Sequence, residues 1–218
     1  MPELKDMILD EISILLNKHG ANIKDYNLPT RSEKTSQYFA NRLIDDEMSY
    51  NLSELEMESA SLCSRLNPKQ MEAFQQIVHC ASNEILGFFF VSGFGGTGKT
   101  FLWNAIVSFL RAKGRIVLTV ASSSVAALLL PGGRTAHSRF KIPLNIADDT
   151  VCDIKRGTML AELIHKTSLV IWDEALMTHR KCFETLDRTL RDIIGGQDPK
   201  AQHLVFGGKV IVLGGDLR

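Results

Sequence analysis

The spacing of hydrophobic and polar positions changes near residue 65. Over residues 2–19, apolar side chains recur at intervals of three and four residues, which predicts an amphipathic helix. Residues 21–35 are polar and typical of a connector, and residues 36–64 show short, mixed helical patterns rich in Ser and Glu. We therefore expect residues 1–65 to form a mostly helical N-terminal extension that packs on the rest of the chain as an accessory segment.

Beyond residue 65 the pattern predicts an α/β domain. Asn67 and Pro68 are typical of a helix N-cap and first turn, and they predict a helix over about residues 68–82. Short apolar runs rich in Val, Ile or Phe then alternate with helical patterns. These runs are Gly87–Val91, Ile116–Val120, Leu169–Trp172 and Val210–Leu213. Continuous apolar strands separated by helices indicate a parallel sheet flanked by helices on both faces.

The composition is that of an ordinary globular protein. The 218 residues are 44% hydrophobic and carry a formal net charge of zero, which excludes disorder for most of the chain. No apolar run approaches the length of about 18 residues that a membrane span needs, and the charged N-terminus lacks a signal-peptide core. The four cysteines form no C-x-x-C pair. We therefore expect an intracellular protein with reduced thiols, no zinc and no membrane partner.

The zero net charge is the sum of two opposite parts. Residues 1–65 carry 7 basic and 12 acidic residues, a net charge of −5, whereas residues 66–218 carry 18 basic and 13 acidic residues, a net charge of +5. An acidic extension joined to a basic domain is a weak indication of separate partner surfaces. The second part is the one expected to contact a polyanion.

The strongest motif is a glycine-rich loop between a predicted strand and a predicted helix. Glycines allow the backbone to curl with its amides pointing at an anion, and the helix that begins near Lys99 adds the positive end of its dipole. Lys99 is expected to contact the β- and γ-phosphates of ATP, and Thr100 to hold Mg2+ through its hydroxyl. The residues Gly93-Phe94-Gly95-Gly96-Thr97-Gly98-Lys99-Thr100 fit the pattern G-x-x-x-x-G-K-[ST]. Apart from Phe94, we predict that all of them bind the triphosphate.

Two adjacent acids end another predicted strand. Asp173 and Glu174 follow the apolar run Leu169–Trp172, and the carboxyl ends of parallel strands face the ligand in such folds. We predict that Asp173 holds Mg2+ and that Glu174 is catalytic and polarises the attacking water, which favours a hydrolase over a small-molecule kinase. Without the glycine-rich loop, the same pair would be better interpreted as the cap of a following helix.

Further segments resemble a known family. Leu66-Asn67-Pro68-Lys69-Gln70 resembles the L-N-x-x-Q motif that precedes the phosphate loop in superfamily-one helicases. Ala121–Ala127 with Gly132–Phe140, then Val170–Ala175 and Val210–Asp216, resemble the following motifs in order. They are most similar to those of the petite-integration-frequency helicases and of the helicases of Helitron transposons.

This resemblance implies a P-loop NTPase fold in which residues 66–218 form the first RecA-like ATPase domain. It implies that Gln70 reads the adenine edge, and that Gly215 and Asp216 belong to the motif that senses the γ-phosphate. It also favours single-stranded DNA as the partner of the loop before residue 141. A basic loop with an interleaved aromatic residue can hold phosphates and stack a base. The predicted DNA contacts are Arg134, Thr135, His137, Arg139 and Phe140. From the residues alone, a solvated basic loop with Phe140 in the core is the better interpretation.

The function implied by the resemblance is that of an ATP-dependent DNA helicase with 5′-to-3′ polarity. The family implies roles in DNA repair, recombination and telomere maintenance, in the nucleus, with ATP, Mg2+ and single-stranded DNA bound. In the family a Gln stands one position beyond this chain's last residue, Arg218. We therefore expect a fragment that stops inside the third motif, lacks the second motor domain, hydrolyses ATP slowly and does not unwind DNA unaided.

Two origins of such a chain stay open. It is either part of a longer helicase or the product of a decayed transposon gene. In the second case it would be a non-motor module that binds ATP and nucleic acid. Another P-loop enzyme, such as a kinase, is less compatible with Gln70 and the loop Gly132–Phe140. The oligomeric state is left open.

Overall fold

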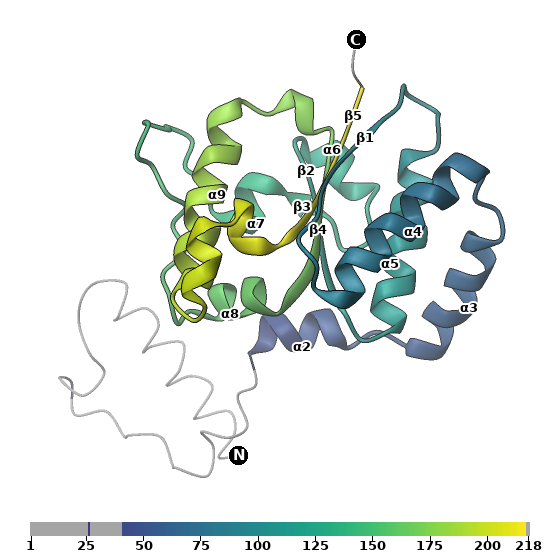
Figure 1. Cartoon of the computed structure of the whole chain (residues 1–218), viewed down its shortest axis with the longest axis horizontal. Helices are drawn as coiled ribbons and strands as arrows, with labels where there is room; N and C mark the ends of the chain where they lie inside the picture. Colours follow the sequence, from purple (N-terminus) through teal and green to yellow (C-terminus); the bar gives the residue numbers. More distant parts are fainter. Residues whose placement is uncertain (1–25, 27–40, 217–218) are drawn as a thin grey trace. The chain divides into compact units, whose positions relative to one another are not determined.

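The computed structural model describes residue 26 and residues 41–216, and the chain divides into two compact units, Met1–Arg42 and Leu43–Arg218. The helix predicted over residues 2–19 lies outside the described residues. The second unit contains the sheet and the candidate site (Figure 1). Of the helices that the structure describes, none has the length and apolarity needed to cross a membrane.

Within residues 41–216, three helices precede the first strand. Helix α2 (Arg42–Met48) and helix α3 (Leu52–Cys63) lie in the region predicted to form short helices. Helix α4 (Pro68–Asn83) confirms the predicted helix after Asn67. It begins with a reciprocal cap, in which the Asn67 side chain accepts a hydrogen bond from the Gln70 amide at 2.9 Å and the Gln70 side chain accepts one from the Asn67 amide at 3.1 Å. Such a cap satisfies two amides that the first helical turn leaves without partners.

Five parallel strands form one sheet, as the apolar runs predict. They are β1 (Phe88–Ser92), β2 (Ile116–Ala121), β3 (Arg134–Thr135), β4 (Thr167–Asp173) and β5 (Val210–Gly215), in the spatial order β1-β5-β4-β2-β3. The last residues of neighbouring strands are in register, since Ser92 pairs with Gly215 and Ala121 pairs with Asp173. All carboxyl ends therefore meet at one edge. Only the two-residue strand β3 is not predicted by the pattern, because so short a segment has no period.

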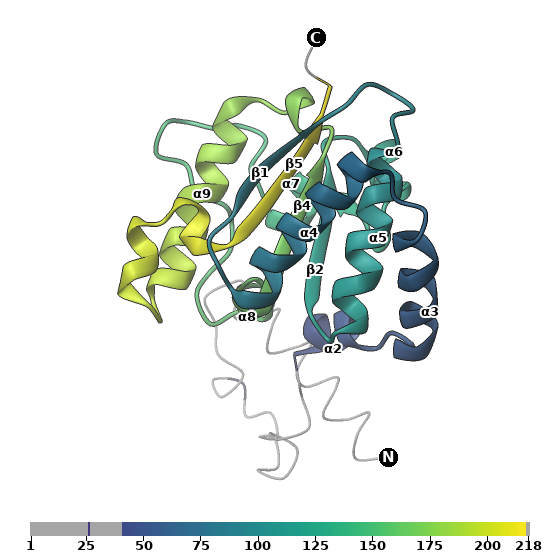
Figure 2. The same ribbon diagram turned by 45° about the vertical axis from the view of Figure 1, so that its right-hand side comes forward.

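Helices cover both faces of the sheet (Figures 1 and 2). Helices α4 and α5 (Lys99–Ala112) pack on one face, and α3 packs on α5. Helices α7 (Ala136–Phe140), α8 (Met159–Lys166) and α9 (Arg180–Gly195) pack on the other. The remaining turns of helix are α6 (Ser124–Leu128) and the 3₁₀ segments Ala175–Met177, Pro199–His203 and Val205–Gly208.

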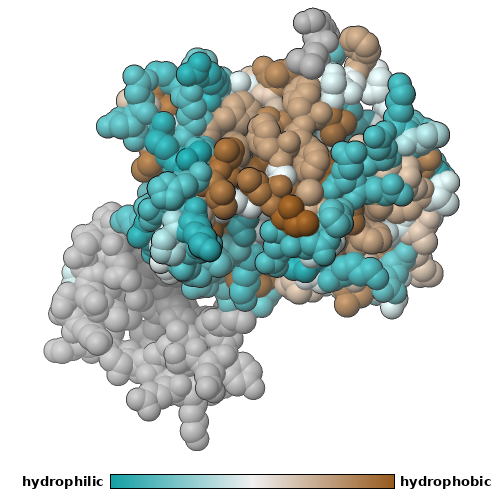
Figure 3. Space-filling view, viewed as in Figure 1, coloured by the Kyte–Doolittle hydropathy of each residue, from teal (hydrophilic) through white to brown (hydrophobic). Residues whose placement is uncertain are grey.

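The strands bury side chains on both faces with a period of two. On β4, Leu169 and Ile171 belong to the core under α4 and α5, whereas Val170 and Trp172 belong to the core under α7, α8 and α9. This alternation directs the next residue, Asp173, to the α5 side of the sheet. At the edge strand β1, Phe88 and Phe90 stay exposed, and apolar side chains gather there between α4 and α9 (Figure 3).

A buried ion cluster attaches α2 to the rest of the unit. The Glu47 carboxylate accepts hydrogen bonds from Arg111 of α5 at 3.1 Å and from Arg139 of α7 at 3.0 Å, and all three side chains are buried. The Tyr50 ring covers the Arg111 guanidinium at 4.3 Å. The segment around α2 therefore pairs with residues of the sheet domain by specific contacts, in addition to packing on it.

Candidate nucleotide site

The glycine-rich loop has the backbone geometry of an anion cradle. Gly96 and Gly98 have φ values of 81° and 85°, which side-chain-bearing residues rarely adopt. A Cβ atom added at Gly93 would lie 2.5 Å from the Thr97 hydroxyl, so a larger residue there would force the Thr97 side chain to shift. Above Gly95 and Gly96 an added Cβ would meet nothing within 4 Å. The loop is thus closely packed at Gly93 and open at Gly95 and Gly96, where phosphate groups would bind.

Lys99 lies at the start of α5 with its ammonium inside the loop. Its Nζ donates hydrogen bonds to the carbonyl oxygens of Gly93 at 2.5 Å and Phe94 at 3.3 Å. The Thr97 hydroxyl also donates to the Phe94 carbonyl, at 2.8 Å. Because α5 is 14 residues long, the positive end of its dipole points at the same space. The ammonium can exchange these two carbonyls for phosphate oxygens with little movement of the chain.

Asp173 contacts helix α5, which begins in this loop. It ends β4 with 6% of its surface exposed, and its Oδ1 accepts a hydrogen bond of 3.1 Å from the Trp103 indole. Trp103 follows Lys99 by four residues and Thr100 by three, so the three side chains share one face of the helix within a single turn. The carboxylate therefore lies beside the turn that carries the predicted phosphate and Mg2+ contacts.

Glu174 departs from the strand conformation. Its φ of 51° places it in the left-handed region, which costs a glutamate about 1–3 kcal/mol and is common at functional sites. Its carbonyl accepts a hydrogen bond of 2.7 Å from the Ser122 hydroxyl. The same hydroxyl contacts the Thr178 hydroxyl at 2.5 Å and accepts a hydrogen bond of 3.1 Å from the Trp172 indole. Glu174 precedes a 3₁₀ turn without a side-chain capping bond. A capping role for its carboxylate is therefore not observed.

Gln70 contacts the loop from α4. Its Nε2 donates to the carbonyl oxygens of Thr97 and Gly98, both at 3.4 Å. A cavity of about 290 Å³ adjoins it and is lined by Asn67, Lys69 and Gly98 among others. The amide predicted to read adenine thus borders a cavity next to the loop, while in this structure it bonds the loop backbone. Reading the adenine edge would require these long hydrogen bonds to be exchanged.

The end of β5 lies between the glycine-rich loop and Asp173, because β5 separates β1 from β4 in the sheet. The Gly93 amide donates to the Gly215 carbonyl at 3.1 Å, so the predicted γ-phosphate motif joins the loop directly. A Cβ added at Gly214 would lie 2.7 Å from both Asp173 Oδ1 and the Trp103 ring. Gly214 therefore leaves the space in which the carboxylate and the indole meet.

The oxygen groups present suit Mg2+ held together with a nucleotide. Among residues 41–216, no three His, Cys, Asp or Glu side chains form a metal cage. Mg2+ usually keeps several waters and binds one or two protein oxygens plus phosphates, for which a full cage is unnecessary. The Thr100 hydroxyl in the first turn of α5 and the Asp173 carboxylate would supply oxygen atoms of this kind.

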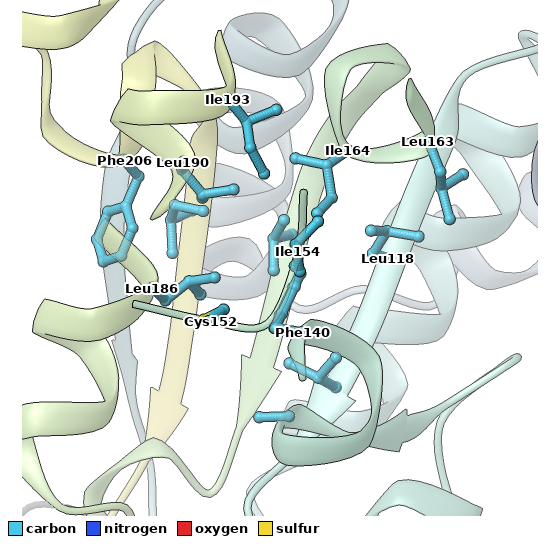
Figure 4. Close-up of a cluster of buried hydrophobic side chains, with 14 of the residues drawn as sticks. Leu118, Phe140, Cys152, Ile154, Leu163, Ile164, Leu186, Leu190, Ile193 and Phe206 are labelled. Carbon is cyan, nitrogen blue, oxygen red and sulfur yellow. The ribbon is translucent and has the colours of Figure 1, made fainter. Parts of the chain in front are cut away.

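Two of the five predicted DNA contacts are corrected by the structure. Phe140 is 0% exposed, with its ring 6.4 Å from that of Trp172 in the core under α7 and α9 (Figure 4). Arg139 is 5% exposed and paired with Glu47. Stacking a base or neutralising a phosphate would require each side chain to leave its buried partner, so both are structural. Burial also lowers the pKa of Arg139, although Glu47 counteracts the shift.

The other three predicted contacts remain on the carboxyl edge of the sheet. Arg134 is exposed at the start of β3. The Thr135 hydroxyl caps α7 by accepting from the Ser138 amide at 3.2 Å. His137 is half-buried, with Nε2 3.9 Å from the Cys182 thiol, and lines a cavity of about 460 Å³ with Met177 and His179 among others.

Sequence reasoning missed Trp103, and it gave no role to Gly214 and Ser122, which lie inside the motif segments. The hydrogen bond from Trp103 joins residues 70 positions apart, so no local pattern contains it. The available signal is the position of Trp103, one turn after Lys99 on the same face of the predicted helix that follows the loop. A buried indole N–H usually has a partner.

Comparison with known proteins gives consistent results. The family model for PIF1-like helicase matches residues 65–218. The chain is 33% identical over 131 residues to ATP-dependent DNA helicase PIF4 of Trypanosoma brucei brucei, covering 58% of this chain and 15% of that protein. The chain spans less than a third of each curated relative that it matches, with 27% the largest share.

Solved structures with the same fold include two helicases. The crystal structure of Pif1 helicase from Candida albicans has a TM-score of 0.54 and 27% identity, over 69% of this chain and 32% of that chain. Pif1 helicase from Bacteroides, in complex with ADP-AlF3 and ssDNA, has a TM-score of 0.51 and 28% identity, over 67% of this chain and 32% of that chain.

Proposed function

Since this chain belongs to the PIF1-like helicase family, we propose that it supplies the ATP-binding part of an ATP-dependent DNA helicase. The observation that carries the proposal is the convergence of two sequence-distant groups on one helical turn. Lys99 begins α5 inside the glycine-rich loop, and Asp173 at the end of β4 is bonded to Trp103 of the same helix. Phosphate and Mg2+ contacts need this proximity in phosphoryl transfer.

Each side chain then has a role that its position supports. Lys99 would bind the β- and γ-phosphates. Thr100 and Asp173 would hold Mg2+, which would supply positive charge to the phosphoryl group when bound. Glu174 accepts a proton from the attacking water. Gly215 and Asp216 belong to the β5 end beside the loop, where a γ-phosphate would be sensed. Gln70 borders the cavity in which adenine would bind.

The DNA contacts assigned to this chain are Arg134, Thr135 and His137. They lie at the edge where the strands end, which is where parallel sheets bind their ligands. The Bacteroides Pif1 structure includes ssDNA. Movement along single-stranded DNA with 5′-to-3′ polarity is part of the proposal. So are roles in repair, recombination and telomere maintenance, and a location in the nucleus. Membership of the PIF1-like helicase family is what supports them.

The test is nucleotide binding and turnover by the 218-residue chain. A fluorescent ATP analogue should bind the wild type in Mg2+, bind Lys99→Ala at least about tenfold more weakly, and bind Glu174→Gln with near-normal affinity. Slow turnover should be stimulated by single-stranded DNA and lost in Glu174→Gln. Full affinity in Lys99→Ala would overturn the proposal. Binding without DNA-stimulated turnover would support the non-motor nucleotide-binding module instead.

A further inference from the structure

We propose that Trp103 is a positioning residue for the metal-binding carboxylate, and that its indole N–H holds Asp173 in the orientation that Mg2+–nucleotide requires. The inference rests on the proposed function and extends it to a residue outside the motifs. Trp103 is 0% exposed, and the hydrogen bond from its Nε1 to Asp173 Oδ1 measures 3.1 Å.

The chemistry of the pair suits a positioning role. An indole has a single donor, and a carboxylate has two oxygens with room for several donors. The hydrogen bond therefore fixes one acceptor position of Asp173 and leaves acceptor capacity for a metal or a metal-bound water. Partners of this kind orient metal ligands, and their loss typically weakens metal affinity about 10–100-fold. Without its donor the buried carboxylate would also keep the cost of its desolvation without a compensating hydrogen bond.

Three elements converge to make the contact. Helix α5 contributes Trp103 and the end of β4 contributes Asp173. The neighbouring strand β5 contributes Gly214, where a Cβ would lie 2.7 Å from both groups. Because Trp103 follows Lys99 by one turn, the indole also sets the distance between Asp173 and the glycine-rich loop. Movement of α5 on nucleotide binding would thus be transmitted to the carboxylate.

The competing explanation is that Trp103 only fills the core, since it belongs to the apolar cluster under α4 and α5. Trp103→Phe separates the two explanations, because phenylalanine retains an aromatic ring and lacks the N–H donor. The matched control is Trp172→Phe. Trp172 is equally buried at 1% exposed, and its indole donates to Ser122 rather than to Asp173.

The experiment measures the affinity of a fluorescent ATP analogue in saturating Mg2+ and in EDTA, and takes the ratio for each chain. We expect Trp103→Phe to lower the Mg2+-dependent gain in affinity at least about tenfold, with EDTA affinity unchanged, and Trp172→Phe to retain the wild-type ratio. An unchanged ratio in Trp103→Phe would overturn the inference. An equal loss of affinity in Mg2+ and in EDTA would also overturn it, because a packing defect lowers nucleotide affinity whether or not Mg2+ is present. A wild type without a Mg2+-dependent gain would instead refute the proposed function.

A second measurement does not depend on the folding of Trp103→Phe. The chain has two tryptophans, so Trp172→Phe leaves Trp103 as the sole indole fluorophore. Because its N–H bonds the metal-binding carboxylate, its emission should change when ATP is added with Mg2+ and stay nearly constant when ATP is added with EDTA. Equal emission changes with and without Mg2+, or none in either, would contradict the positioning role.

Discussion

Replacing Glu47 with glutamine removes the negative charge from a cluster in which it faces two guanidinium groups. Glu47 is 8% exposed, and its two oxygens lie 3.1 Å from Arg111 and 3.0 Å from Arg139. The variant keeps the shape of the side chain and one acceptor oxygen. Both arginines then lose their opposite charge while they remain buried.

The expected loss follows from the cost of an unpaired buried charge. Removing one partner of a buried pair typically costs about 3–5 kcal/mol, whereas the intact pair contributes little net stability. The lowered pKa of Arg139 agrees with this, because burial outweighs the attraction to Glu47. For a domain with a free energy of unfolding of about 5–15 kcal/mol, such a loss is large. It corresponds to a decrease in Tm of about 6–20 °C.

The free energy of unfolding can be measured by urea titration, followed by the fluorescence of the buried Trp103 and Trp172. The control is Glu58→Gln in α3, because Glu58 is exposed and a surface substitution should change stability by at most about 0.5 kcal/mol. Salt should leave the difference between wild type and Glu47→Gln nearly unchanged, since buried pairs are weakly screened. A loss below about 1 kcal/mol would refute the reasoning, because it would mean that water reaches the two arginines.

Four further predictions concern other parts of the unit. Burial lowers the pKa of Lys209 from 10.5 to about 8, so between these pH values the unfolded chain binds a proton that the folded chain has released. The unfolding free energy of the wild type should therefore rise with pH relative to Lys209→Met, as urea titrations at several pH values would show. Arg134→Ala should weaken single-stranded DNA binding and reduce its salt slope by about 0.7–1. Phe140→Leu should leave the affinity for single-stranded DNA unchanged, as measured by fluorescence anisotropy. It should lower the free energy of unfolding by about 1 kcal/mol, as measured by urea titration. Gly214→Ala should cost about 1–3 kcal/mol and weaken Mg2+-dependent nucleotide binding, because the new methyl group would collide with Asp173.

Local sequence patterns predict the sheet and the loop because these features are local. The apolar runs identify four of the five strands, and the glycine-rich loop carries its own backbone requirements at Gly96 and Gly98. Asp173 is predictable for the same reason, since it ends an apolar strand. Its alternation with Ile171 even gives the face of the sheet on which it lies.

The roles of Arg139 and Trp103 depend on partners far away in the chain. Arg139 looks like a DNA contact in a basic loop, and only the fold brings Glu47, 92 positions earlier, next to it. The charge of the loop is therefore smaller than its composition suggests. The opposite holds for Trp103. The sequence pattern indicates a core residue, and the fold gives it a polar partner 70 positions later in the chain. Hydrophobic periodicity describes faces of elements and carries no information on which polar pairs meet.

Helix α5 connects the Trp103–Asp173 contact with the Glu47 cluster, because it makes contacts near both of its ends. Lys99 at its start lies in the glycine-rich loop, Trp103 one turn later holds Asp173, and Arg111 near its end shares Glu47 with Arg139 of α7. Arg139 directly precedes Phe140 and follows His137 on the same short helix, next to the proposed DNA contacts. If α5 shifts on nucleotide binding, the shift would act on both the Asp173 carboxylate, which we propose holds Mg2+, and the loop that we propose contacts DNA. In this arrangement Arg139 joins α7 to α5 through their shared partner Glu47, which explains why a basic residue of the loop is buried.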